Sequence, residues 1–104
     1  MLYIDNPVGT GFSFSEHKGF CKNMTCVGKH MYLGLAQFLM IFPWLQKNDL
    51  YLTGESFAGK YIPAIGNEIM ERNKNSNFKL NLKVNLNRFV LVFKYFKIIH
   101  SQFP

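Results

Sequence analysis

The spacing of apolar residues changes along the chain and predicts two helices. Between residues 27 and 45, apolar side chains recur at three- and four-residue steps, which indicates a helix with one buried face. We expect this helix to end at Pro43, and its inner face carries Leu35, Phe38, Leu39 and Phe42. A second helix is predicted over residues 57–73, with an inner face of Ile62, Ile65 and Ile69.

Three shorter segments have the pattern of strands. Residues 2–4 and 50–53 are almost continuously apolar, as in strands buried on both faces of a parallel sheet. From residue 80 to 87, apolar residues alternate with Asn and Lys, which is the period of a half-buried strand. The order strand, helix, strand, helix, strand predicts an α/β fold, a mostly parallel sheet with flanking helices.

Ser56 lies where the second of these strands meets the second helix. Gly54 stands two residues before it and Ala58 two residues after it. This is the spacing of a nucleophile elbow, a tight strand-to-helix turn that exposes a serine oxygen and requires small neighbours. The N-terminus of the helix would stabilise a developing oxyanion, with the N–H of Phe57 as one donor. The alternative is that Ser56 only caps the helix.

A base and an acid for this serine are difficult to find. The three histidines are His17, His30 and His100. In an α/β hydrolase the base follows the acid late in the chain, but no Asp follows Ser56. Glu68 and Glu71 are both expected on the helix that leaves the turn, where neither can orient a base for Ser56. No cluster of His, Asp and Glu has the spacing of metal ligands, so no metal site is predicted.

The charge and the apolar runs of the chain bear on whether it binds nucleic acid or spans a membrane. The chain has 104 residues and a net charge of +6, but no block of five like charges, so a nucleic-acid-binding tail is not indicated. The apolar run 89–99 contains two lysines and is shorter than the roughly 20 residues of a membrane-spanning helix. We therefore expect no membrane span, and the first residues do not resemble a signal peptide.

Three local features leave alternatives open. Cys21 and Cys26 could pair in an oxidising compartment or remain free in the cytosol, and they do not by themselves make a zinc site. Asn23 begins an Asn-Met-Thr sequon, a candidate glycosylation site in a secreted chain. Gly9 and Gly11 lack the third glycine of a dinucleotide loop, so a nucleotide site is not expected.

Two segments resemble a known family. Residues 54–63, Gly-Glu-Ser-Phe-Ala-Gly-Lys-Tyr-Ile-Pro, resemble the active-site signature of the serine carboxypeptidases, although that family more often has Tyr where this chain has Phe57. Residues 5–13, Asp-Asn-Pro-Val-Gly-Thr-Gly-Phe-Ser, are similar to the vitellogenic-like branch of the family. The likeness covers residues 1–87, which are expected to form part of an α/β-hydrolase domain, and residues 88–104 form a divergent apolar tail.

The resemblance implies a serine-type carboxypeptidase that releases C-terminal residues from peptides through an acyl-enzyme on Ser56. It implies that Phe57 supplies its N–H to the oxyanion hole and its ring to the substrate pocket. Glu55 would belong to the acidic hydrogen-bonding system that holds the C-terminal carboxylate of the substrate. The expected partner is a peptide C-terminus, no cofactor is expected, and the oligomeric state is left open. A secreted or lysosomal location is implied.

The family's catalytic Asp and His, and its Gly-Gly-Pro-Gly segment, are not found among these residues. The chain is therefore expected to be a truncated central fragment that is inactive alone, since loss of triad members leaves only residual catalysis. The alternative function is that of a non-catalytic basic fragment, an interaction or aggregation-prone module with open sheet edges.

Overall fold

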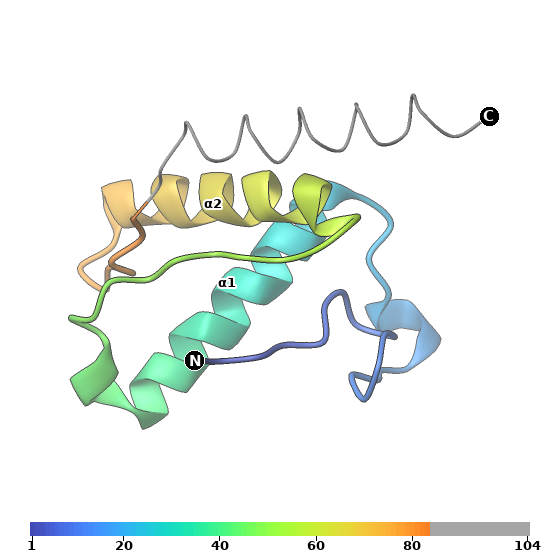
Figure 1. The fold of residues 1–104 in the computed structure, drawn as a ribbon, viewed down its shortest axis with the longest axis horizontal. Coiled ribbons are helices and arrows are strands. Elements are labelled where there is room, and N and C mark those ends of the chain that lie inside the picture. The colour runs from blue at the N-terminus through green and yellow to red at the C-terminus, as the bar shows by residue number, and fades with distance from the viewer. Residues whose placement is uncertain (84–104) are drawn as a thin grey trace.

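The computed structural model describes residues 1–83, and two long helices that cross each other dominate this part of the chain (Figure 1). The element order is η1, a 3₁₀ helix over His17–Gly19, then α1 (Met24–Ile41), η2 (Pro43–Leu45) and α2 (Ala58–Asn75). The expected apolar tail at 88–104, and the end of the last expected strand, lie outside the described residues.

The bounds of α1 follow from a cap and a proline. The side chain of Asn23 accepts a hydrogen bond from the N–H of Cys26 at 2.9 Å, which satisfies one of the free donors at the start of the helix. The helix therefore begins three residues before the expected Val27. It ends at Ile41 because Pro43 cannot continue it, and residues 43–45 tighten into η2.

The second helix matches its expected range closely and ends two residues later. Pro63 lies in the second turn of α2 without ending the helix. Arg72 and Lys74 occupy the last turn, where positive charge complements the helix dipole. Each pairs with a glutamate one turn earlier, Glu68 and Glu71 respectively.

The core lies between the two helices and the chain segments that precede and follow α2. Its buried members are Tyr32, Leu35, Ile65, Ile69 and Leu80, with Leu50, Leu52 and Leu82 packed against them. The expected inner faces are confirmed at Leu35, Ile65 and Ile69, which are buried, and the other residues expected on these faces are half-buried. The helices approach closely at Gly28, where a Cβ would lie 2.8 Å from the carbonyl oxygen of Ala64.

The expected strands are represented by one β-bridge. No strand is assigned within residues 1–83, but Leu50 and Leu82 form an isolated parallel bridge. The N–H of Leu50 donates to the carbonyl of Asn81 and the N–H of Lys83 donates to the carbonyl of Leu50, both at 2.9 Å. Strands need neighbours to pair their backbone groups, and residues 2–4 have no strand partner in the described part of the chain. The bridge joins the two expected strands in a parallel direction.

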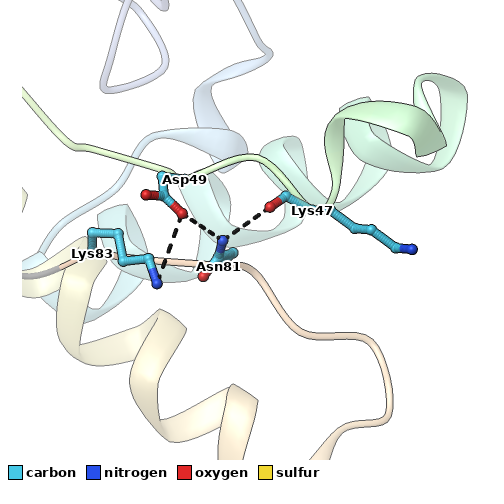
Figure 2. Close-up of polar contacts among 4 residues, drawn as sticks. All are labelled: Lys47, Asp49, Asn81 and Lys83. Carbon is cyan, nitrogen blue, oxygen red and sulfur yellow. Dashed lines mark hydrogen bonds and ion pairs between the residues drawn. The ribbon is translucent and has the colours of Figure 1, made fainter.

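Side chains lock the register of this bridge (Figure 2). The amide nitrogen of Asn81 donates to the carbonyl of Lys47 at 3.1 Å and to Asp49 at 2.9 Å. Lys83 adds a long ion pair to the same carboxylate at 3.7 Å. These contacts hold the segment before Ser56 against the segment after α2.

A second polar link fixes the chain as it returns from α2. The side-chain amide of Asn73 donates to the carbonyl of Leu80 at 2.8 Å and accepts from the N–H of Leu80 at 3.0 Å. One side chain thus satisfies both backbone groups of a buried residue, as a neighbouring strand would.

The glycine-rich segment at residues 5–13 folds around Asp5. The N–H groups of Gly9, Thr10, Phe12 and Ser13 all donate hydrogen bonds within the segment, that of Phe12 to the Asp5 carboxylate at 2.9 Å. Gly9 and Gly11 both have positive φ, and a Cβ on Gly11 would overlap the Asp5 carboxylate. These N–H groups are used inside the loop and do not point outward as a phosphate cradle requires.

No helix within residues 1–83 is long and apolar enough to cross a membrane.

Candidate active site

Ser56 occupies the turn between the segment that bridges to Leu82 and the start of α2. In Figure 1 the chain from residue 50 to this turn runs along α2, which then leaves the turn in the opposite direction. The φ angle of Ser56 is 55°, in the left-handed region that residues other than glycine rarely adopt. Ser56 is exposed. Such backbone strain at an exposed polar residue is typical of functional turns.

The residues two places on either side of Ser56 come into close contact. A Cβ placed on Gly54 would lie 2.5 Å from the Cβ of Ala58. Real Cβ atoms do not approach so closely, so the turn can form only with glycine at position 54 and a small residue at position 58. The close approach predicted from the spacing of small residues is present.

Within residues 1–83, the hydrogen bonds of the turn do not use the N–H of Phe57. The N–H of Ala58 donates to the carbonyl of Glu55 at 3.0 Å, and that of Gly59 donates to the carbonyl of Ser56 at 3.1 Å. Phe57 is the N-cap of α2 and the helix has no side-chain cap, so Ser56 does not cap it and that alternative is wrong. Among residues 1–83, the N–H of Phe57 has no hydrogen-bond acceptor.

The side chain of Phe57 is about half exposed beside the turn. Its ring packs edge-on against the ring of Tyr61, with centroids 5.0 Å apart, and the ammonium of Lys60 lies 4.8 Å from its centroid. A cation over an aromatic face is attracted by the ring quadrupole. Lys60 therefore places a positive charge next to the turn, a feature that the sequence pattern alone did not indicate.

The three glutamates at the turn and on α2 divide into one that makes no ion pair within residues 1–83 and two that are paired. Glu55 is exposed and makes no ion pair within the described part of the chain. Glu68 pairs with Arg72 at 2.9 Å and Glu71 pairs with Lys74, both along α2 itself. Glu55 is thus the carboxylate that the turn holds next to Ser56.

The histidines are not gathered at the turn. His30 lies on α1 beside Cys21 and Cys26. His17 belongs to η1, and His100 lies outside the described residues.

A shallow pocket of about 370 Å³ lies at the other end of α2, lined by Tyr32, Glu71, Arg72, Asn75 and Ser76. It includes none of the residues around Ser56.

Cys21 and Cys26 form a disulfide, which is the first of the two alternatives left open by the sequence. The proximity of His30 to both sulfurs was missed, because the expected helix began at residue 27 and excluded Cys26. A signal was present, since Asn23 has the position and chemistry of an N-cap.

Asn23 is exposed, and its side-chain oxygen accepts the cap hydrogen bond. Its glycosylation stays a prediction.

The part of the chain that includes both segments singled out above matches a known protein family. The model of the serine carboxypeptidase family matches residues 1–90. The venom serine carboxypeptidase of Apis mellifera is 52% identical over 84 residues, which cover 80% of this chain and 18% of that protein. The probable serine carboxypeptidase CPVL of Mus musculus is 51% identical over 84 residues, with the same coverage of both chains.

The vitellogenic carboxypeptidase of Aedes aegypti is 45% identical over 84 residues, which cover 80% of this chain and 17% of that protein. The chain therefore spans less than a fifth of the length of these relatives. The match to the family model extends over most of the chain and confirms the resemblance carried by residues 5–13 and 54–63. This chain belongs to the serine carboxypeptidase family.

Proposed function

We propose that this chain carries the nucleophile of a serine-type carboxypeptidase, a hydrolase that releases C-terminal residues from peptides through an acyl-enzyme on Ser56. The observation that carries the proposal is the backbone of Ser56, held at a φ of 55° in an exposed turn at the start of α2. A serine in this conformation projects its oxygen away from its own backbone, where a substrate carbonyl can reach it.

The groups on either side of Ser56 suit the two charges of such a reaction. The N–H of Phe57 has no acceptor within residues 1–83 and stands at the positive end of α2, so it can donate to an oxyanion. The ring of Phe57 would line the substrate pocket. Glu55 would join a hydrogen-bonding system for the substrate carboxylate, because a protonated carboxyl group can donate to a carboxylate.

The segments around Ser56 support an α/β-hydrolase arrangement. Leu50 precedes α2 in the chain and Leu82 follows it, and the two residues form a parallel bridge. This is the connection of a strand-helix-strand unit. The Cys21–Cys26 disulfide favours an oxidising compartment, which supports a secreted or lysosomal location.

The 104-residue chain is expected to lack turnover by itself. No Asp follows Ser56, and both glutamates on α2 pair with basic residues of the same helix. His30 is held beside a disulfide on α1. Residues 1–83 position no base and acid beside Ser56, and without them an exposed serine gives only residual catalysis.

The test is covalent labelling of the purified chain with a fluorophosphonate, followed by peptide mapping. We expect the label on Ser56, and none in a Ser56→Ala variant. Ser15→Ala is a matched control that removes another exposed serine and should leave the labelling unchanged. A blocked dipeptide offered at acid pH should show no steady release of its C-terminal residue.

Two results would contradict these expectations. Equal labelling of Ser15 and Ser56 would show that the turn gives Ser56 no special reactivity. Steady peptide release that disappears in Ser56→Ala would show that the chain contains a working base.

A second candidate function rests on a different observation. Large apolar side chains are exposed across the described residues, among them Phe12, Phe14, Met40 and Trp44, at 97%, 91%, 73% and 70%. On a basic chain, this surface supports a non-catalytic interaction module. Self-association without labelling of Ser56 would favour this second function.

A further inference from the structure

Three potential metal ligands meet at the start of α1. The sulfur of Cys21 lies 3.3 Å from Nδ1 of His30, and the sulfur of Cys26 lies 3.8 Å from Nε2 of the same ring. One ligand atom from each of the three residues can be chosen so that all lie within 4.8 Å of one another. The cysteines are half-buried and His30 is exposed. The group is separate from Ser56 and is used by no step proposed above.

Local structure explains why these residues meet. Cys26 and His30 are four residues apart on α1, so their side chains lie on the same face of the helix. Asn23 caps the helix through the N–H of Cys26, and the disulfide holds Cys21 beside Cys26, with the Cα atoms of the two cysteines 5.4 Å apart. The helix thus positions Cys26 and His30, and the sequence separation of 5 between the two cysteines limits how far Cys21 can move when the bond between the sulfurs is cleaved.

We propose that, when its disulfide is reduced, this cluster binds one Zn²⁺ or a similar thiophilic divalent cation through Cys21, Cys26 and His30. A dithiol reductant would supply two electrons and two protons and would itself become a disulfide, leaving two thiols on the chain. Binding of the cation then releases both thiol protons, and a neutral imidazole nitrogen of His30 donates its lone pair.

The distances suit such a site. Zinc binds sulfur at about 2.3 Å and nitrogen at about 2.0–2.1 Å, so tetrahedral ligands stand about 3.6 Å apart for a sulfur and a nitrogen. The two observed sulfur-to-nitrogen distances, 3.3 and 3.8 Å, lie on either side of this value. The sulfurs must move apart to about 3.8 Å, which cleavage of the disulfide permits. The two distances run to different ring nitrogens and only one nitrogen can bind the ion, so the ring must turn to bring that nitrogen within reach of both sulfurs, from a start at which the ligand atoms lie within 4.8 Å of one another.

Charge and access also fit the cation. Two thiolates neutralise a divalent ion, and Cys26 lies in the first turn of α1, where the helix dipole favours a negative group. Three protein ligands leave the fourth position of a tetrahedral ion open, and the exposure of His30 gives water access to it. The disulfide and the metal site use the same sulfurs, so they exclude each other.

The experiment is a titration of the full chain with Co²⁺, a spectroscopic substitute for Zn²⁺, after reduction and under anaerobic conditions. We expect one Co²⁺ per chain, with thiolate-to-cobalt charge-transfer absorption and the intense visible bands of a tetrahedral ion, both lost on adding Zn²⁺. The disulfide form should show neither. His30→Ala should weaken binding roughly tenfold or more. The matched control Lys29→Ala removes an exposed neighbour on α1 and should bind as the unaltered chain does.

Alkylation gives a second readout. Zn²⁺ should protect Cys21 and Cys26 of the reduced chain from iodoacetamide, and His30→Ala should remove much of this protection. Circular dichroism monitors α1 throughout, because reduction could unfold it. In that case the cation should restore the helix as it binds.

Several results would overturn the proposal. One is the absence of charge-transfer bands in a reduced chain whose helix is intact. Another is failure of the cation to restore a helix lost on reduction. A third is equal affinity in the His30→Ala variant, which would show that the imidazole is not a ligand. Binding to the disulfide form would place the cation elsewhere.

Discussion

At the scale of the residue, Ser56 and its neighbours show how a short spacing of small side chains sets backbone geometry. Gly54 and Ala58 touch across the turn, and this contact is possible because neither has a larger side chain. The sequence predicted this part of the site well because the constraint is local. It did not predict that Lys60 would lie over the ring of Phe57, since that contact depends on the rotamers of two long side chains.

We expect Gly54→Ala to destabilise the chain by about 1–3 kcal/mol, because the new Cβ would overlap Ala58 and force the turn to shift. Gly59→Ala is the matched control. A Cβ at Gly59 meets nothing within 4 Å and lies in the first turn of α2, so it should stabilise by up to about 1 kcal/mol. Urea unfolding followed by circular dichroism measures both. Equal effects of the two substitutions would show that the contact across the turn is not tight.

At the scale of the element, the helices were more predictable than the strands. The bounds of α1 could be predicted to within a few residues from the period of its apolar residues and from Pro43, because both act locally. A strand depends on a partner that is distant in the chain, and Leu50 pairs with Leu82 across the whole of α2. The alternation at residues 80–83 indicated an extended segment. It gave no sign that the side chain of Asn73 would pair with Leu80.

Asn73→Ala should lower the free energy of unfolding by about 1–3 kcal/mol, because it leaves the N–H of buried Leu80 without a partner and removes one of the two donors to its carbonyl, the other being the N–H of Leu82. The control is Asn75→Ala, an exposed position two residues later, where a change within about 0.5 kcal/mol is expected. Chemical denaturation of the two variants in parallel provides the comparison. A loss at Asn75 as large as that at Asn73 would contradict the role of the pairing.

At the scale of the whole molecule, the described residues combine a small core with a large exposed apolar surface. Six hydrophobic residues of this part of the chain are buried, five of them in the core between the helices, whereas Phe12, Phe14 and Trp44 are mostly exposed. The sequence could not show which aromatic residues would lie outside the core, because that depends on how the helices pack. Twelve basic and six acidic residues leave a net charge of +6 that opposes association.

Salt should therefore promote self-association of the chain. Raising ionic strength from about 0.01 M to 1 M shortens the range of charge repulsion from about 30 Å to 3 Å, while apolar contacts persist. We expect the weight-average mass in sedimentation experiments to rise with salt, and to rise less in a Phe12→Ser, Phe14→Ser double variant. A mass that falls with salt would show instead that charge pairs hold the copies together.

The positive φ of Ser56 also bears on how this chain would change under selection. The left-handed conformation costs a residue with a side chain roughly 1–2 kcal/mol, and glycine avoids most of that cost. A library of variants selected only for thermal stability should therefore accumulate glycine at position 56. Selection for the reaction should keep serine there despite the strain. In directed evolution, the residue recovered at position 56 would thus distinguish lineages kept for their fold from lineages kept for their chemistry.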